Sequence, residues 1–127
     1  MEQSFRAILL ASSGVAALVG TRINWGAHPQ GQPLPAVVLT GISENDTHHM
    51  TGPTRLYEAR VQVDCYADTY SGAKALSRAI LTVLDGYKGG VFQGIFSAGA
   101  RDMREGGTNE AARPYRVSMD FMTHWSE

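Results

Sequence analysis

Residues 57–67 have the sequence YEARVQVDCYA, in which apolar and polar side chains alternate. The apolar positions are Ala59, Val61, Val63 and Cys65. The polar positions between them are Glu58, Arg60, Gln62 and Asp64. A period of two is the pattern of a β-strand with one face in a core and the other in solvent. The segment therefore predicts a sheet with a polar outer face and a buried, unreactive cysteine.

The length of this strand predicts a projecting arm. A strand over residues 54–67 spans about 45 Å at the usual rise per residue. A globular chain of 127 residues has a radius of gyration of only about 14 Å. The strand must therefore bend or extend beyond the body. We expect the polar loop over residues 44–53 to be the tip of a hairpin arm.

Three further segments are predicted as strands. Residues 36–43 are rich in Val, Leu and Ile, residues 91–98 follow a Gly-Gly pair, and residues 115–124 alternate like the central segment. The last two strands form a hairpin with a long polar loop over residues 104–113. A short additional strand is possible at residues 22–24, before a Pro-rich connector.

Helical periodicity occurs at two places. Residues 2–11 place Phe5, Ile8 and Leu9 on one face, and a second short helical turn, capped by Ser13, ends at Gly20. A longer helix follows a cap at Asp68 or Thr69 and stops at Gly86. Its apolar face carries Leu76, Ile80, Val83, Leu84 and Tyr87.

These elements predict a single α+β domain over residues 1–127. Its sheet is largely antiparallel, with about four strands, helices packed on one face and a projecting hairpin arm. The chain carries 11 basic and 12 acidic residues and one cysteine. This balance removes the usual electrostatic reason to bind nucleic acid, and one cysteine allows no internal disulfide.

No segment reaches the length of a membrane span. The uncharged stretch over residues 7–20 imitates a secretory signal, but Glu2 and the Ser12-Ser13-Gly14 interruption disfavour that interpretation. We expect cytoplasmic synthesis.

One cluster of polar residues suggests chemistry. Asp46, His48 and His49 stand together in the predicted loop, but adjacent histidines point in different directions and no HExxH spacing is present. We interpret the cluster as a solvated loop, and predict no catalytic residue, cofactor or metal. A small metal-dependent enzyme using these three residues is the alternative from a different class.

Charged and aromatic residues allow two interpretations. Glu58, Arg60 and Asp64 on one strand and Arg116 and Asp120 on another either pair across a solvated sheet or face a neighbouring subunit. Trp25 and Trp125 either pack at the edge of the core or anchor an interface. For Trp125 we favour a docked C-terminal strand.

An ordered set of segments resembles a known family. The segments are residues 5–10 (FRAILL), 15–20 (VAALVG), 33–38 (PLPAVV), 52–53 (GP), 58–67 (EARVQVDCYA), 73–76 (AKAL) and 115–121 (YRVSMDF). Together they resemble the small tail-completion proteins, or tail terminators, of siphophages, prophages and gene transfer agents.

The resemblance implies a structural virion protein. Such proteins form a ring, typically a hexamer, that caps the head-proximal end of the tail tube, stops tube polymerisation and binds the head-side connector while double-stranded DNA passes through. The implied partners are further copies, the tube protein and the connector, with no membrane. A head-side connector or stopper subunit is the alternative. The candidate subunit-interface residues are Asp46, His48, His49, Met50, Arg55, Glu58, Arg60, Arg104, Arg113 and Trp125.

Overall fold

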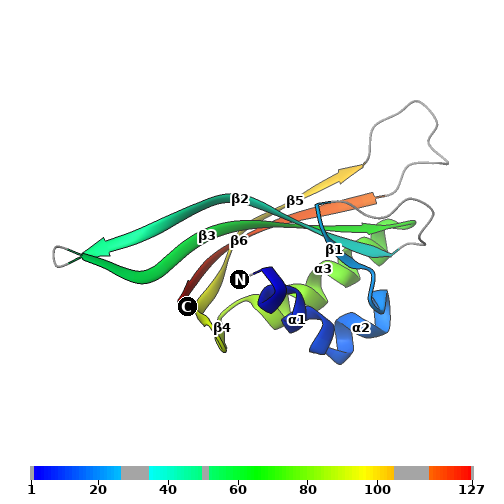
Figure 1. Ribbon diagram of the computed structural model, residues 1–127. Helices are drawn as coiled ribbons and strands as arrows, with labels where there is room; N and C mark the ends of the chain where they lie inside the picture. Colours follow the sequence, from blue (N-terminus) through cyan, green and yellow to red (C-terminus); the bar gives the residue numbers. More distant parts are fainter. Residues whose placement is uncertain (1, 27–34, 50–51, 105–114, 127) are drawn as a thin grey trace.

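The computed structural model describes residues 2–26, 35–49, 52–104 and 115–126. Within these ranges the chain forms three helices and six strands (Figure 1). The helices are α1 (Glu2–Ala11), α2 (Ser13–Val19) and α3 (Tyr70–Leu84). The strands are β1 (Ile23–Trp25), β2 (Ala36–His49), β3 (Gly52–Ala67), β4 (Tyr87–Gly89), β5 (Phe92–Arg104) and β6 (Tyr115–Ser126). The predicted α+β class is confirmed.

All six strands belong to one sheet in the order β1-β2-β3-β6-β5-β4. The prediction of about four strands is therefore too low. The sheet is also not wholly antiparallel, because β1 pairs parallel to β2, with Ile23 opposite Val37. Parallel pairing of consecutive strands needs a long connection, which residues 26–35 supply. Strands of three residues, such as β1 and β4, carry too few positions for a periodic signal, which is why β4 was not predicted.

The helices cover one face of the sheet, as predicted (Figure 1). The largest fully buried side chains come from both layers and include Phe5, Leu9, Leu76, Ile80 and Phe121. The alternation along β3 holds on this face, since Ala59, Val61, Val63 and Cys65 are all buried. Burying such side chains is the main favourable term in folding.

The helix ends follow local capping chemistry. The N-cap of α2 is Ser12 rather than the predicted Ser13, because the Ser12 hydroxyl accepts a hydrogen bond from Val15 N at 3.4 Å. Thr69 caps α3 by accepting from Gly72 N at 3.0 Å. The backbone turns away after α3 at Gly86, whose φ of 81° is costly for residues with a side chain.

The predicted loop over residues 44–53 is mostly strand, so that prediction was wrong. β2 continues to His49, and Asn45 and Asp46 pair with Glu58 and Tyr57 of β3. These polar residues have weak intrinsic β propensity, and pairing with the long neighbouring strand overrides it. β5 likewise continues to Arg104.

The paired strands β2 and β3 run past the helix layer at one end of the molecule (Figure 1). We call residues 46–49 and 52–57 of this hairpin the ribbon. The predicted projecting arm is therefore present, but as a two-stranded ribbon. None of the helices in the described ranges is long and apolar enough to cross a membrane.

Candidate functional site

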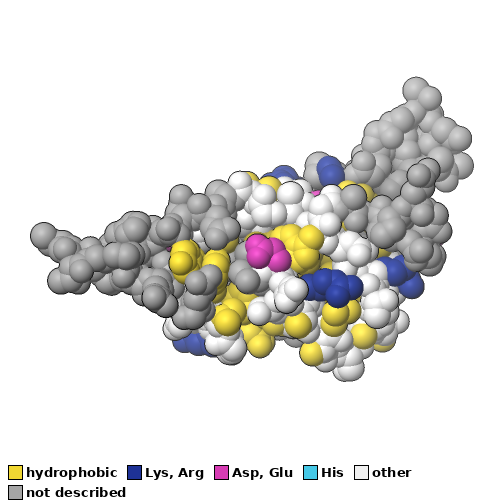
Figure 2. Space-filling view, viewed as in Figure 1, with side chains coloured by type: hydrophobic (Ala, Val, Ile, Leu, Met, Phe, Trp, Pro, Cys, Tyr) yellow, Lys and Arg dark blue, Asp and Glu magenta, His cyan; other side chains and the backbone are white. Residues whose placement is uncertain are grey.

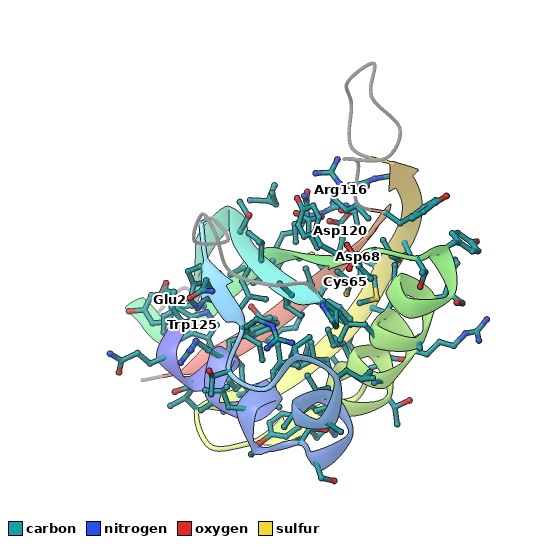
Figure 3. The ribbon with its side chains drawn as sticks, turned by 90° about the vertical axis from the view of Figure 1, so that its right-hand side faces the viewer. Glu2, Cys65, Asp68, Arg116, Asp120 and Trp125 are labelled. Atoms are coloured by element: carbon teal, nitrogen blue, oxygen red, sulfur yellow. The ribbon has the colours of Figure 1, made fainter. Side chains whose placement is uncertain are left out.

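The sheet face opposite the helices carries a network of charged side chains. We call it the helix-free face. At its centre, the Asp120 carboxylate on β6 accepts hydrogen bonds from Arg60 on β3 at 2.9 Å and from Arg101 on β5 at 3.2 Å. Figure 3 shows Asp120 and Arg116 on the side of the strands away from α1 and α2. The network therefore joins three neighbouring strands through one carboxylate.

Asp120 is buried although no helix covers it. Its side chain is 6% exposed, whereas those of Arg60 and Arg101 are 42% and 53% exposed. The two guanidinium groups thus lie over the carboxylate and supply the opposite charge that a buried ion requires. Their own outer surfaces stay in contact with solvent, where they are open to further partners.

Asp64 corrects the prediction of a uniformly solvated face. The residue is 4% exposed, and Gln62 Nε2 donates to its two carboxylate oxygens at 3.0 and 3.2 Å. Ser118 on β6 is fully buried, and its hydroxyl accepts from Arg101 Nη2 at 3.4 Å. Long polar side chains of the same strand and of the neighbouring strand shield the shorter ones, which strand alternation alone does not reveal.

A second charged pair lies nearer the ribbon. Glu58 and His124 occupy opposite positions on β3 and β6, and His124 Nδ1 lies 3.8 Å from Glu58 Oε2. Both side chains are more than a third exposed, so the pair contributes little to stability. The prediction of cross-strand charge pairing is confirmed. A role for these charges against a neighbouring subunit stays a prediction.

Several candidate interface residues lie on the ribbon. Asp46, His48 and His49 belong to β2 and Arg55 to β3, but the structure describes only their backbone. Arg104 is the last residue of β5 and is described in the same way. Met50 and Arg113 lie outside the described residues. The seven residues therefore stay predictions as interface residues.

The hypothesis of a metal site also stays untested at Asp46, His48 and His49. Among the side chains that the structure does describe, no group of three His, Cys, Asp or Glu residues is placed to hold a metal ion.

Trp125 docks the C-terminal strand into the core. It is 6% exposed and stacks on Tyr57, with ring centroids 4.4 Å apart and an interplanar angle of 23°. This confirms the prediction of a docked terminus, and leaves the side chain little area for contact with another chain. The other tryptophan, Trp25, donates from Nε1 to the backbone oxygen of Glu2 at 3.0 Å and so ties α1 to the sheet.

Cys65 has the inert environment that the alternation predicts. It is fully buried in the core face of β3. Burial, and secondarily the negative charge of Asp64, raise the pKa of the thiol far above its ordinary range. A protonated, inaccessible thiol is neither a nucleophile nor a metal ligand.

The two long edges of the sheet are only partly covered, a feature that the sequence analysis missed. On one side β1 pairs with β2 as far as Leu39. On the other side β4 pairs with β5 as far as Ile95, and the Asp85 carboxylate accepts the Ser97 N–H at 3.0 Å. Beyond these points, no strand in the described part of the chain pairs with the outer edge of β2 or β5. The only sequence signal was the great length of the strands.

The surface over the helix layer differs from these edges. Figure 2 shows apolar side chains spread among polar atoms in small groups, with Lys or Arg and Asp or Glu side chains between them. Among the large apolar side chains exposed in the structure, Leu18 and Leu81 lie on helices and are each 37% exposed. Scattered exposure of this kind is normal for a protein surface and indicates no binding site.

Comparison with known proteins gives a family and a fold. The sequence profile of a family described as "Tail completion protein gp17" matches residues 3–125. No curated protein sequence matches the chain significantly. A chain of a structure titled "Virion of native gene transfer agent (GTA) particle" is similar with a TM-score of 0.66 and 23% identity. The match covers 97% of this chain and 92% of that chain.

Proposed function

The chain belongs to the tail completion protein gp17 family, and on this premise we propose that its copies form a hexameric ring at the head-proximal end of a phage-type tail tube. The ring ends polymerisation of the tube and offers its other side to the head-side connector. Double-stranded DNA crosses it in transit. The protein is thus a structural component of the virion tail that assembles in the cytoplasm.

The observation that carries the proposal is the shape of the domain. One sheet has helices on a single face and a ribbon that extends beyond them (Figure 1). A domain with a radius of gyration of about 14 Å cannot enclose a DNA passage by itself. Several copies can do so when each contacts the next through two different surfaces, because such heterologous contacts close into rings. The ribbon supplies a surface that reaches beyond the body of the domain.

The charge distribution supports passage of DNA without retention. The chain has a formal net charge of −1, and two arginines of the helix-free face, Arg60 and Arg101, are both paired with Asp120. Affinity for DNA comes from basic groups that neutralise phosphates. An arginine that is paired with a carboxylate contributes less to the affinity for DNA. The proposed structural role requires no catalytic residue and no cofactor.

Electron microscopy of complete particles tests the proposal. We expect six-fold density for this protein between the tube and the connector, in contact with the tube protein. Particles made without the chain should carry tubes of uncontrolled length, because nothing stops subunit addition. A ring that contacts only head-side proteins, with tube length unchanged in its absence, would instead establish the stopper role and reject the terminator role.

A further inference from the structure

We propose that neighbouring copies are joined by backbone hydrogen bonds between the open edge of β2 in one copy and the open edge of β5 in the next. The inference rests on the proposed function, which requires a ring, and it names the contact that builds it. The occupant of each edge is thus a second copy of this chain.

Three residues of β2 turn their backbone groups toward the outer edge, where no strand in the described part of the chain pairs with them. The Val37 N–H donates to Arg22 O at 2.9 Å, and Leu39 O accepts from the Gly26 N–H at 2.8 Å. The backbone groups of Val37 and Leu39 therefore point away from β3. Their β3 partners are the odd-numbered residues. The register shifts after Gly41. Two residues that lie opposite each other in an antiparallel pair either both hydrogen-bond to one another or both point their backbone groups outward. The β2 residues opposite odd-numbered β3 residues therefore still point outward beyond the shift. The outward-pointing groups beyond the part of β2 that β1 covers therefore belong to Gly41, Glu44 and Asp46.

The edge of β5 has a matching set. Ile95 O accepts from the Gly86 N–H at 2.7 Å and the Ser97 N–H donates to Asp85, so these residues point away from β6. Both lie opposite odd-numbered residues of β6. The next residues with odd-numbered partners are Ala100, Asp102 and Arg104, opposite Met119, Val117 and Tyr115. In the described part of the chain no strand lies against either set.

The directions of the two edges suit each other. Three successive antiparallel pairings separate β2 from β5, so the two strands run in opposite directions within one sheet. A neighbouring copy that continues the sheet keeps its strand directions. Its β5 therefore meets β2 antiparallel, the arrangement in which the hydrogen bonds run perpendicular to the strands and the pairing is slightly more stable per residue. An exposed strand edge is a ready template for such an addition.

The stagger of the two edges suits a ring. Glu44, in the outward-pointing set of β2, is level with Thr123 of β6, whereas Ala100, in the outward-pointing set of β5, is level with Met119. Four residues of β6 separate these levels, so pairing Glu44 with Ala100 shifts each copy by about 14 Å along the strands. Four strands per copy are about 19 Å wide. A shift and a width of these sizes give strands tilted by about 35° to the ring axis, at the lower end of the usual 35–45° of closed sheets.

The formal charges of the two edges are opposite in sign. Residues 40–49 contain Glu44 and Asp46 and no Lys or Arg, whereas residues 96–104 contain Arg101 and Arg104 with one acidic residue, Asp102. Electrostatic complementarity favours the contact of unlike edges and disfavours the pairing of two β2 edges.

Disulfide trapping in assembled particles tests the contact directly. Cysteines are introduced at Glu44 or Asp46 together with Ala100 or Asp102, and wild-type Cys65 is retained because it is buried. Within one chain the two positions lie three strand spacings apart, about 14 Å, which exceeds the reach of a disulfide. We expect oxidation to produce a ladder of covalent oligomers of this chain in at least one combination. Single-cysteine variants serve as controls and should give no ladder beyond a dimer.

Proline substitution tests the hydrogen bonds themselves. Ala100→Pro removes an outward N–H, whereas Ala100→Val keeps it and serves as the matched control. We expect Ala100→Pro to lower incorporation into particles by at least about tenfold, the loss produced by about 1.4 kcal/mol, and Ala100→Val to incorporate normally. The melting temperature of each purified variant shows whether its fold is intact, and if Ala100→Pro fails to fold, the disulfide experiment decides.

The outcomes separate this inference from the proposed function. A six-fold ring without any trapped disulfide, or with normal incorporation of a folded Ala100→Pro variant, would overturn the edge contact and leave the ring standing. Trapping of the tube protein in place of a second copy would also overturn it. Absence of this chain from any ring would reject the proposed function itself.

Discussion

The side chains on the two faces of β3 are buried in different ways. Val61 and Val63 are fully buried because helices lie over them. Asp64, on the opposite face, is 4% exposed without any helix above it, because polar neighbours enclose it. Apolar packing of the first kind is complete within one chain. Charged side chains of the second kind can exchange partners, which suits a surface that meets other subunits or DNA.

Truncation on the helix-covered face should have the largest effect. Phe121→Ala removes a fully buried ring of β6 and should lower the free energy of unfolding by about 3–5 kcal/mol. The control, Met122→Ala, changes the next residue on the helix-free face and should cost less than about 1 kcal/mol. Chemical denaturation of the purified chain measures both. Equal losses would show that the two faces do not differ as described.

Removal of the Asp120 carboxylate, on the helix-free face, should lower the free energy of unfolding by a smaller amount. Asp120→Ala leaves Arg60 and Arg101 without their shared acceptor. We expect a loss of about 1–2 kcal/mol, at the lower end for charged hydrogen bonds because both arginines are partly solvated. Asp120→Asn keeps one acceptor oxygen and should lose about half as much. A double-mutant cycle with Arg60→Ala measures the coupling, and additive effects would contradict the network.

Cys65 provides a pH-dependent test of the covered face. Burial raises the pKa of its thiol above the ordinary value of 9.0. Above that pH the unfolded chain loses the thiol proton while the folded chain keeps it, so the thiol contribution to stability falls as pH rises, by up to about 1.4 kcal/mol per unit. The Cys65→Ala variant should lack this extra decline. Parallel pH profiles of wild type and variant would contradict a buried, protonated thiol.

Neutralisation of the exposed pair should have the smallest effect. Glu58→Gln removes the charge that faces His124, in a pair that is well exposed on both sides. The free energy of unfolding should change by less than about 0.5 kcal/mol. A larger loss, measured by the same denaturation assay, would place Glu58 with Asp120 as a structural carboxylate.

Local sequence patterns predicted the elements that depend on near neighbours in the chain. The apolar positions of α1 and α3 and the buried positions of β3 lie where the periodicity places them. Tyr87 is the exception, because α3 ends at Leu84 and Tyr87 begins β4. Residues 44–49 were predicted as loop because their propensity is low, yet they pair with residues 52–59 of a strand on the other side of the turn. Propensity yields to such pairing because each added pair satisfies backbone groups.

The candidate site was predicted only in part, because some of its contacts depend on the register of strands that are far apart in the sequence. The positions of Glu58, Arg60 and Asp120 on the polar face follow from alternation once β3 and β6 are recognised, whereas the pairing of Glu58 with His124 depends on the register of these strands. The contribution of Arg101 depends on the register of β5, including the irregularity between Ser97 and Gly99. No local sequence pattern predicts that shift in register.

The sequence by itself determined which residues face the core, where the helices begin to within one residue, and the family to which the chain belongs. Only the tertiary structure decided the strand order, the parallel addition of β1, the burial of Asp64 and Asp120, and the open edges of β2 and β5. The physical reason is range: side-chain periodicity and capping act within a few residues, whereas β3 meets β6 across about half the chain. Contacts between residues this far apart in the sequence decide which strand edges stay uncovered and which charged side chains bury one another.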